Sequence, residues 1–188
     1  MYKYGEEISY NFELLKADDF ESLQLFQCGN EPLDNHIRSG VIENGMIVDE
    51  DGLYFKFTDT TTEKIIAIVS IAASGIIHEE GLFVQVLPAI KLDVLAVDKS
   101  YQKMHYNAEI EKEDEHYYFS DEILGNIIYH CKEMTENYAL ANYIVVYADQ
   151  DAYRYYERNG FSNFEKFMKT EHNMEVLKNI PMYLDLNI

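Results

Sequence analysis

The sequence predicts an α/β fold in which helices flank a mixed sheet with a parallel centre. Two observations carry this prediction. Strand-like apolar segments alternate with amphipathic helical segments along the second half of the chain. The run from Lys91 to Asp98 is apolar almost throughout, as expected for a strand that is covered on both faces. A chain of 188 residues, 47% of them hydrophobic, has the size of one domain with its own core.

Turn and cap residues divide the first half of the chain into short elements. Asp18 and Asp19 suit the first turn of a helix, where the helix dipole favours acidic side chains, and Gly29 and Pro32 mark a turn. A polar turn at 59–63 between two strand-like segments predicts a hairpin. The expected elements are a strand at Ser9–Leu15, helices at about Ala17–Phe26 and Leu33–Gly40, and strands at Leu53–Thr58 and Lys64–Ser74.

The segment Gly75–Val86 has no clear periodicity. Its last part, Leu82–Val86, fits either a short strand or a flap, and Pro88 is expected to limit it. Farther along, Ser120 suits the N-cap of a helix, and Gly160 suits a helix end. The expected elements are a helix from about Ser120 to Tyr138, a strand at Asn142–Ala148, a helix at about Gln150–Arg158, and strands at Phe161–Met168 and Met182–Leu186.

A long connection joins the central strand to the helix that follows it. Such connections usually take about 2–6 residues, whereas this one runs from Lys99 to Phe119 and contains a charge run at 109–115. A charge run of this kind is usually solvated. We therefore expect a single domain over residues 1–188 with an insertion at about 104–117.

Charge is the strongest signal in the composition. The chain has 34 acidic and 15 basic residues, which gives a formal net charge of −19. An acidic surface repels nucleic-acid phosphates and anionic lipids and attracts cationic amines or basic peptides, although it also simply keeps a protein in solution. The expected partner is therefore a small-molecule or peptide amine, and nucleic acid is not expected.

Several classes of protein are disfavoured by simple patterns. No run approaches the ~18 apolar residues of a membrane helix, and the N-terminus lacks the pattern of a signal peptide. No Cys/His cluster has metal-ligand spacing, so no metal site is expected. Cys28 and Cys131 lack basic neighbours that would lower a thiol pKa, which favours core thiols over nucleophiles. We expect a protein of the reduced cytoplasm.

Three patterns follow one another in a fixed order. They are Leu95-Ala96-Val97-Asp98 followed by Tyr101-Gln102, the helix start Ser120-x-x-Ile123-Leu124, and Ala152-x-x-x-Tyr156-Glu157-x-x-Gly160-Phe161. Together they resemble the GNAT superfamily of acyl-CoA-dependent N-acetyltransferases, and the third pattern is the most specific. Two further segments resemble a branch that includes toxins acting on charged tRNA: Phe26-Gln27-Cys28-Gly29-Asn30-Glu31-x-Leu33-Asp34 and Pro181-Met182-Tyr183-Leu184. The likeness spans roughly Phe12 to Leu186.

The resemblance implies a sheet whose central parallel strands splay apart, with acetyl-CoA as the co-substrate between them. The pantetheine arm is then expected along the end of the central strand, and the diphosphate at the start of the following helix. Tyr156 matches the tyrosine that often protonates the departing thiolate in this family. The cofactor-binding residues implied are Leu95, Ala96, Val97, Gln102, Lys103, Ser120, Asp121 and Glu122.

The phosphate cradle departs from the family's pattern. The family places Gln/Arg-x-x-Gly-x-Gly/Ala directly before the helix. Here Gln102-Lys103-Met104 is separated by the insertion from Tyr118-Phe119-Ser120, and residues 99–119 contain no glycine. A side chain in place of glycine crowds the approach of backbone to phosphate. Asp121 and Glu122 also put negative charge in the first turn, where a phosphate competes with it.

Acetyl transfer needs a neutral amine, a donor to the thioester oxygen and a proton for the leaving thiolate. A backbone N–H near Val97 suits the first donor, and the phenol of Tyr156, with an ordinary pKa of ~10, suits the second. Taken alone, Tyr156 is better explained by packing beside Phe161. The candidates for the base are Asp93, His78 and Glu79. Asp93, a carboxylate within the apolar strand, is our first choice for this base. The alternative that Asp93 is only the first exposed position of the strand is equally well supported.

The leading prediction is an N-acetyltransferase that moves an acetyl group from acetyl-CoA to a primary amine, small or cationic. The alternative is a catalytically degenerate protein that keeps the fold and binds another ligand or a partner protein. The missing glycines favour the alternative, and the pattern around Tyr156 favours the enzyme. Exposed tyrosines and the final strand offer a means of pairing two copies as a homodimer.

Overall fold

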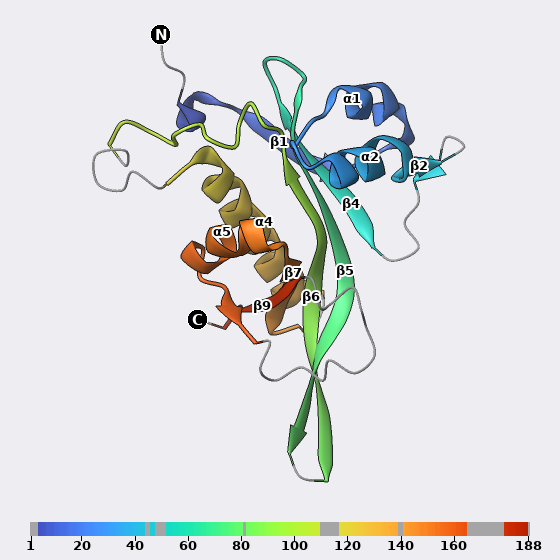
Figure 1. Ribbon diagram of the computed structural model, residues 1–188, viewed down its shortest axis with the longest axis vertical. Helices are drawn as coiled ribbons and strands as arrows, with labels where there is room; N and C mark the ends of the chain where they lie inside the picture. Colours follow the sequence, from blue (N-terminus) through green and yellow to red (C-terminus); the bar gives the residue numbers. More distant parts are fainter. Residues whose placement is uncertain are drawn as a thin grey trace. The chain divides into compact units, whose positions relative to one another are not determined.

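The computed structural model describes residues 4–43, 46–47, 52–80, 82–109, 117–138, 141–164 and 179–187, without the side chains of Met46 and of 78–80. The chain forms two compact units, one from Met1–Ile71 and Val94–Ile123, the other from Ala72–Asp93 and Leu124–Ile188. Three elements run from one unit into the other: β5 (Ile65–Glu80), β6 (Phe83–Val97) and α4 (Phe119–Asn137), as Figure 1 shows. The single domain with an insertion stays a prediction.

Three strands of the first unit follow one another in antiparallel pairs. β1 (Tyr10–Leu14) pairs with β4 (Leu53–Asp59), and β4 pairs with β5. The turn between β4 and β5 is closed by the Asp59 carboxylate, which accepts the amides of Thr61 and Thr62 at 2.8 and 3.2 Å. The predicted hairpin with a polar turn is therefore confirmed.

The 3-10 turn η1 (Gly5–Glu7) precedes β1 in the chain. Between β1 and β4 lie the 3-10 turn η2 (Ala17–Asp19) and the helices α1 (Phe20–Leu25) and α2 (Glu31–Ser39), followed by a two-stranded sheet of β2 (Ile42–Glu43) and β3 (Met46–Ile47). Asn30 caps α2, because its side chain accepts the Leu33 amide at 3.2 Å, and Pro32 lies in the first turn, where its missing donor does no harm. One core cluster of this unit comprises Leu15, Leu23, Phe26, Ile37, Val41, Ile42, Ile65, Ile68 and Ala96.

The second unit is organised on β7 (Tyr143–Ala148). It runs parallel to β6 over Ala89–Leu92 and antiparallel to β9 (Ile180–Asp185), which also pairs with β8 (Ser162–Asn163). The strand order is β1-β4-β5-β6-β7-β9-β8, and the parallel pair at its centre confirms the predicted mixed α/β sheet. Of the strand expected at Phe161–Met168, residues 165–168 lie outside the described part of the chain.

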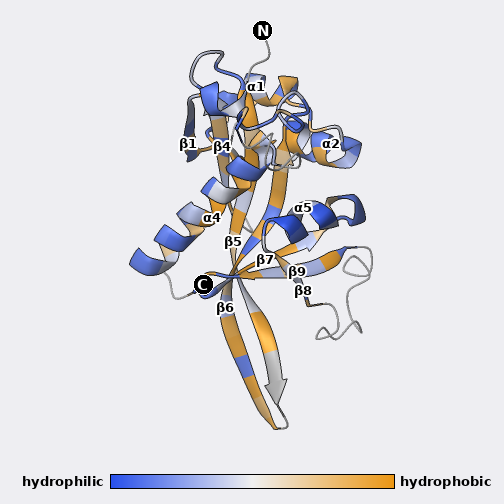
Figure 2. Cartoon of the chain, turned by 90° about the vertical axis from the view of Figure 1, so that its left-hand side faces the viewer, coloured by the Kyte–Doolittle hydropathy of each residue, from blue (hydrophilic) through white to orange (hydrophobic). Residues whose placement is uncertain are grey.

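Helix α4 follows the predicted periodicity. Ile123, Leu124, Ile127 and Cys131 have no exposed surface. Figure 2, coloured by hydropathy, shows mostly orange strands and helices in which blue segments alternate with orange ones. The second helix of this region is split, with a 3-10 turn η3 (Gln150–Ala152) before α5 (Tyr153–Arg158). Gly160 ends it with φ +88°, a left-handed conformation that glycine adopts without strain.

β5 and β6 are longer than the sequence predicts. The segment expected to be a short strand or a flap belongs to one long hairpin, in which β5 reaches Glu80 and β6 begins at Phe83. Pro88 does not limit β6, so that expectation is wrong. Its carbonyl accepts the Asn142 amide at 3.1 Å, and the nitrogen of a strand residue faces the same side as its carbonyl. The missing donor therefore faces the side of β7, where the ladder begins only at Ala89.

Candidate functional site

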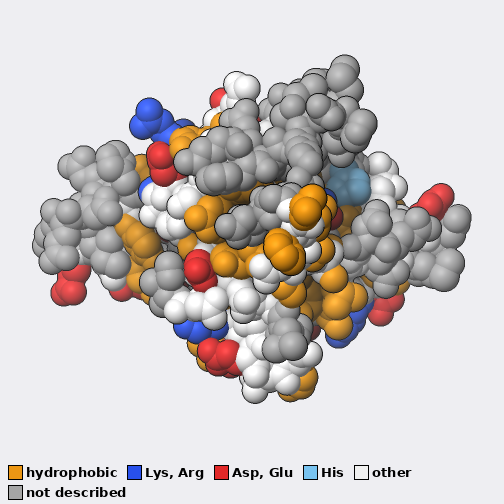
Figure 3. All heavy atoms as spheres, turned by 90° about the horizontal axis from the view of Figure 1, so that it is seen from below, with side chains coloured by type: hydrophobic (Ala, Val, Ile, Leu, Met, Phe, Trp, Pro, Cys, Tyr) orange, Lys and Arg blue, Asp and Glu red, His pale blue; other side chains and the backbone are white. Residues whose placement is uncertain are grey.

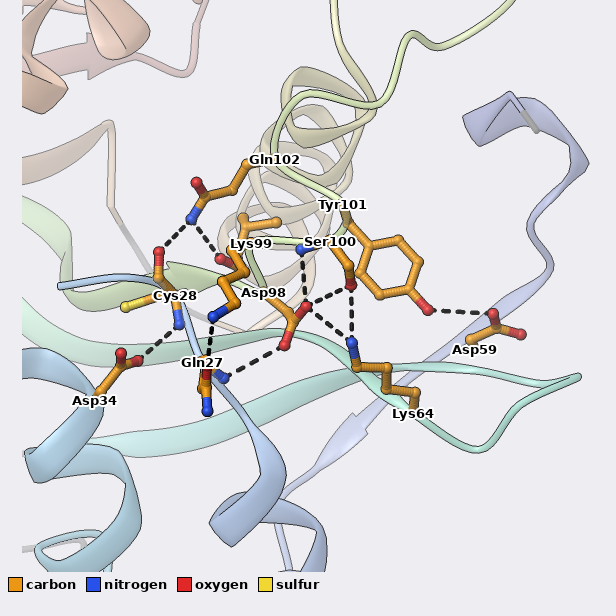
Figure 4. A network of polar contacts seen from close by, with 11 residues as sticks. Gln27, Cys28, Asp34, Asp59, Lys64, Asp98, Lys99, Ser100, Tyr101 and Gln102 are labelled. Carbon is orange, nitrogen blue, oxygen red and sulfur yellow. Dashed lines mark hydrogen bonds and ion pairs between the residues drawn. The ribbon is translucent and has the colours of Figure 1, made fainter. Parts of the chain in front are cut away.

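The carboxylate of Asp98 fastens the end of β6, as Figure 4 shows. It is buried and accepts hydrogen bonds from the hydroxyl and the amide of Ser100, the latter at 2.9 Å. It also accepts from Nζ of Lys64 at 3.0 Å and from the amide of Gln27 at 3.3 Å. The amide of Asp98 donates to the carbonyl oxygen of Ile66 on β5 at 2.8 Å. Asp98 therefore ties the turn after β6 to β5 and to the segment after α1.

Opposing effects set the pKa of Asp98. Burial raises the pKa, because the charged form loses hydration, but the hydrogen bonds from Ser100 and the ion pair with Lys64 outweigh it and hold the pKa below the usual 3.8. The carboxylate is therefore ionised at neutral pH. The sequence analysis missed this role, and the one available signal was an acidic residue directly after an apolar strand.

A second set of contacts joins the turn after β6 to the segment Gln27–Gly29. The side-chain amide of Gln102 donates to the carbonyl oxygen of Cys28 at 2.6 Å. From the other side, the Asp34 carboxylate accepts the amides of Cys28 and Gly29 at 2.7 and 3.2 Å. The segment that resembles the toxin branch is thus a loop held between α2 and the turn after β6.

The alternation of backbone directions is interrupted along β6. The carbonyl of Pro88 faces β7, so strict alternation would turn the carbonyl of Val97 towards β5. The amide of Asp98 donates to β5 instead, which places the preceding Val97 carbonyl on the opposite side, where it accepts from Gln102 at 2.8 Å. An irregularity of the β-bulge type therefore lies between these points. The ladder with β7 ends at Leu92, so residues 93–97 present an edge beyond it.

The start of α4 differs from the prediction. The helix begins at Phe119, so Ser120 is its second residue, and the expected N-cap at Ser120 is wrong. The hydroxyl of Ser120 donates to the carbonyl oxygen of Gln102 at 3.2 Å. The amide of Phe119, which the resemblance leaves open to an anion, donates to the carbonyl oxygen of Met104 at 2.7 Å. The Phe119 ring is fully buried.

Two carboxylates lie in the first turn of α4. The buried Asp121 carboxylate accepts the amide of Tyr118 at 2.8 Å, and the amide of Asp121 donates to the carbonyl oxygen of Tyr118 at 3.0 Å. The hydrogen bond from the Tyr118 amide to the Asp121 carboxylate is one half of a capping box, and it satisfies the carboxylate in its buried position. Glu122 accepts a hydrogen bond from the Tyr117 hydroxyl at 3.0 Å. Burial, and then the charge of Glu122, raise the pKa of Tyr117 well above its usual value.

The insertion leaves and returns at adjacent positions. His105 and Tyr118 form an isolated antiparallel bridge at its base, and residues 110–116 lie outside the described part of the chain. Of the predicted cofactor residues, Gln102 contacts both Val97 and Ser120. The exposed Lys103, like Leu95, Ala96, Asp121 and Glu122, keeps its cofactor role as a prediction.

Tyr156 lies on α5 in the second unit and is 6% exposed. Its ring makes edge contacts with Tyr155 and Phe161 at centroid distances of 5.3 and 5.4 Å. Burial raises the pKa of its phenol well above the usual 10. No described residue forms a hydrogen bond or an ion pair with its hydroxyl. The phenol therefore keeps its proton at any physiological pH.

Asp93 is exposed on β6, also in the second unit, and forms an ion pair with Lys91. Nζ of Lys91 lies 5.5 Å from the centroid of the Tyr147 ring. An exposed, paired carboxylate agrees with the surface reading of Asp93, and its role as a base stays a prediction. The backbones of His78 and Glu79 lie in β5, and their side chains are outside the description.

The thiols and carboxylates elsewhere show no reactive arrangement among the described residues. Burial raises the pKa of Cys28 to about 11 and that of Cys131 to about 12. The described residues contain no group of three or more His, Cys, Asp and Glu side chains that could hold a metal ion. No helix in the described part of the chain is long and apolar enough to cross a membrane.

The fold is similar to that of several solved toxins. A bacterial toxin matches with a TM-score of 0.66 and 18% identity over 96% of this chain and 92% of the other. This likeness shows the fold, and it agrees with the fold that the resemblance to the GNAT superfamily implies. AtaTR bound with acetyl-CoA matches with a TM-score of 0.63 and 16% identity, over 95% and 94% of the two chains. AtaT in complex with acetyl-methionyl-tRNAfMet matches with 0.64 and 14%, over 95% and 96%. No protein-family model and no curated protein matches the sequence.

Proposed function

We propose that this protein is an acetyl-CoA-dependent N-acetyltransferase. The observation that carries the proposal is the end of β6. The strand continues to Val97, although its ladder with β7 stops at Leu92. A turn held by the hydrogen bonds of the Asp98 carboxylate then connects it to α4. A strand edge of this kind can pair with the amides of a pantetheine arm as it would with a peptide. A structure of the same fold with acetyl-CoA bound supports this choice of ligand.

In the proposed reaction, a neutral primary amine attacks the thioester carbonyl carbon. A C–N bond forms and the C–S bond breaks, while the amine nitrogen loses one proton and the CoA thiolate gains one. The amide of Val97, the last residue of β6, is the proposed donor to the thioester oxygen. Tyr156 is the proposed acid, and Asp93 the candidate base.

The surroundings of Tyr156 bear on its proposed role as the acid in two ways. The buried phenol keeps its proton at neutral pH, so a proton is present when the thiolate leaves, but its raised pKa makes it a weaker acid than an ordinary tyrosine. Packing against Phe161 fixes the ring whichever role it has.

Two observations bear on the molecule that accepts the acetyl group, and they favour different molecules: the net charge of this chain and its structural similarity to AtaT. A net charge of −19 favours a small or cationic amine, such as a polyamine or a basic peptide. The AtaT complex with acetyl-methionyl-tRNAfMet favours an aminoacyl-tRNA. We rank the cationic amine first, because the charge belongs to this chain itself and opposes the approach of RNA phosphates.

A second candidate function is ligand or partner binding without catalysis. It is favoured by the start of α4, where the amide of Phe119 donates to the chain itself and Asp121 and Glu122 add negative charge. A diphosphate would have to compete with these groups. In this case the edge of β6 at residues 93–97 would bind another ligand instead of a pantetheine arm.

Calorimetric titration separates the two candidates. We expect micromolar binding of acetyl-CoA and weaker binding of acetyl-pantetheine, followed by release of CoA when spermidine, a basic peptide or an aminoacyl-tRNA is added. Binding of neither thioester would exclude the enzyme. Binding without CoA release by any of the three amines would favour the second candidate.

A further inference from the structure

Two charged residues interrupt the apolar sequence of β6. Among the 15 residues of this strand, Lys91 and Asp93 alone carry a charge. Figure 3, seen from the hairpin's end of the molecule, shows hydrophobic side chains gathered there. A charged side chain in an apolar strand loses hydration unless it has a partner or a route to solvent. The position of this pair therefore needs a physical explanation.

The sheet register puts the pair on the same face as Tyr147. Lys91 lies opposite Val145 in the parallel ladder of β6 with β7, which ends at Leu92. Side chains two residues apart along a strand face the same side, so Asp93 follows Lys91 on this face and Tyr147 follows Val145. All of these residues belong to the second unit. The three polar side chains therefore lie together where the ladder of the two strands ends.

The ammonium group of Lys91 is held by two different groups. Its Nζ forms an ion pair with the Asp93 carboxylate and lies 5.5 Å from the centroid of the Tyr147 ring. The carboxylate attracts an ammonium ion by its charge, and the ring attracts it by the negative potential of its face. The side chains of Lys91 and Asp93 are 30% and 33% exposed. A molecule in solution can therefore reach the place that the ammonium group occupies.

The same arrangement suits the ammonium group of another molecule. Alkyl amines have pKa values of about 10 and α-amino groups of about 8, so both are largely ammonium ions at neutral pH. An ion pair that is open to solvent stabilises a protein little, and the stem of a lysine is flexible. Lys91 can therefore leave this place at small cost, and an ammonium ion can take it.

We propose that Asp93 and Tyr147 form the binding site for an ammonium group of the acceptor, and that Lys91 occupies this site until the acceptor displaces it. The inference rests on the proposed acetyl transfer and adds the groups that receive the acceptor. Lys91 acts as an internal competitor, because it keeps the Asp93 carboxylate paired while no acceptor is bound. A neutral molecule cannot displace it, so the site selects cations.

Two sources can supply such an ammonium group. The first is the second amino group of a polyamine, which keeps its proton while another amine of the same molecule reacts. In that case Asp93 anchors the acceptor. The second is the α-amino group of an aminoacyl ester, which has to lose its proton before it reacts. In that case Asp93 is also placed to take the proton.

An NMR titration of the full chain without acetyl-CoA tests the competition. The probes are spermidine and alanine methyl ester at about pH 6.5, where both are cations. Lys91→Met should tighten binding of the probe that uses the site by about 2–5-fold, because the internal competitor is gone. The matched control is Lys16→Met, which removes the same charge from an exposed ion pair with Glu13 and should leave binding unchanged. Equal effects of the two substitutions would mean that only net charge matters, and would overturn the proposal.

Substitutions of the two receiving groups test the site itself. Tyr147→Leu should weaken binding by about 2–5-fold, whereas Tyr147→Phe keeps an aromatic face and should bind like the parent. Asp93→Asn should weaken it by more than about 5-fold, because the carboxylate is lost and the charge of Lys91 is left without it. A Tyr147→Leu or Asp93→Asn protein that binds as tightly as the parent overturns the proposal. Circular dichroism of each variant checks the fold.

Kinetics of acetyl transfer separate the two sources of the ammonium group. Lys91→Met should lower KM more than it alters kcat for the amine that uses the site. A lower KM for spermidine alone assigns a polyamine, and a lower KM for the ester alone assigns an aminoacyl group. An unchanged KM for both overturns the proposal. Because the titration contains no acetyl-CoA, binding without transfer contradicts the proposed function alone, and transfer without the expected changes in binding contradicts this site alone.

Discussion

The side-chain amide of Gln102 donates to the carbonyl oxygen of Val97 across 2.8 Å, and the same nitrogen donates to the carbonyl oxygen of Cys28 across 2.6 Å. One side chain thus sets the end of β6 against the loop that follows α1. Ser120 completes the connection by donating to the carbonyl oxygen of Gln102. The edge of β6 proposed to bind pantetheine depends on this side chain for its position.

Replacing Gln102 by alanine should therefore affect both the fold and the proposed ligand. Two partly buried carbonyls lose a donor, which should lower the free energy of unfolding by about 1–3 kcal/mol. Binding of acetyl-CoA should weaken several-fold. Urea denaturation and calorimetry measure these effects. Gln150→Ala at the exposed start of η3 is the control. Equal behaviour of the two variants would contradict the role of Gln102.

Asp98 should make the stability depend on acid pH. Its pKa is lower in the folded chain than the usual 3.8, so its contribution is present above that value and is lost as the pH falls through the folded pKa. Asp98→Asn should lower the free energy of unfolding by about 2 kcal/mol at pH 7, with the difference from the parent shrinking below pH ~4.

The control for Asp98 is the second aspartate of the same stretch. Asp93 is exposed, and among the described residues its ion pair is with Lys91, so Asp93→Asn should change stability by less than about 0.5 kcal/mol. Denaturation of both variants between pH 3 and pH 8 makes the comparison. An equal loss in the two would mean that the hydrogen bonds around Asp98 do not stabilise the turn.

Thiol chemistry provides a third prediction. The pKa values of about 11 for Cys28 and about 12 for Cys131 keep both thiols protonated at pH 8. Because the thiolate is the reactive form, iodoacetamide should modify the native protein far more slowly than the urea-unfolded chain. Half-buried Cys28 should react before buried Cys131. Mass spectrometry of peptides over time reads the order, and fast native modification of Cys131 would contradict its burial.

Local patterns predicted most of the sheet and helices, because those elements follow from periodicity. The apolar spacing of Ile123, Leu124 and Ile127 placed α4 correctly, and the run ending at Asp98 placed the central strand. The long hairpin was not predicted, because a proline normally interrupts a ladder. Here the missing donor of Pro88 faces the side of β7, where the ladder begins only at Ala89.

The fastened turn after β6 could not be predicted from local patterns. Gln27 and Asp98 are 71 residues apart, and Cys28 and Gln102 are 74 apart. Each of these hydrogen bonds joins a side chain to a backbone group. The residue type at the backbone partner therefore does not indicate that a bond forms there. The buried cap formed by Asp121 was equally hidden, since an acid in a first turn is usually exposed to solvent.

Tyr156→Phe tests the proposed acid. No hydrogen bond of the described residues is lost, so the melting temperature and the binding of acetyl-CoA should stay unchanged, while turnover should fall by about 10²–10⁴-fold. The raised pKa also means that the parent should show no loss of rate near pH 10 from this tyrosine. Tyr153→Phe, at a half-buried position on the same helix, is the control. Full activity of Tyr156→Phe would assign the residue to packing alone.

Glu122→Gln tests whether a diphosphate binds at the start of α4. The amide keeps an acceptor for the Tyr117 hydroxyl but removes a charge that repels a phosphate, so acetyl-CoA should bind about 2–5-fold more tightly. The gain should shrink at high salt, because the repulsion is screened. Acetyl-pantetheine, which has no diphosphate, should show no change.

Glu136→Gln near the other end of the helix is the matched control, since it removes the same charge far from the first turn. Asp121→Asn is less informative, because Asp121 also caps the Tyr118 amide, and its loss lowers stability by about 1 kcal/mol. If Glu122→Gln and Glu136→Gln bind acetyl-CoA equally, the diphosphate does not lie at this helix. The cofactor would then depend on the β6 edge alone, and the carboxylates of the first turn would serve the insertion instead.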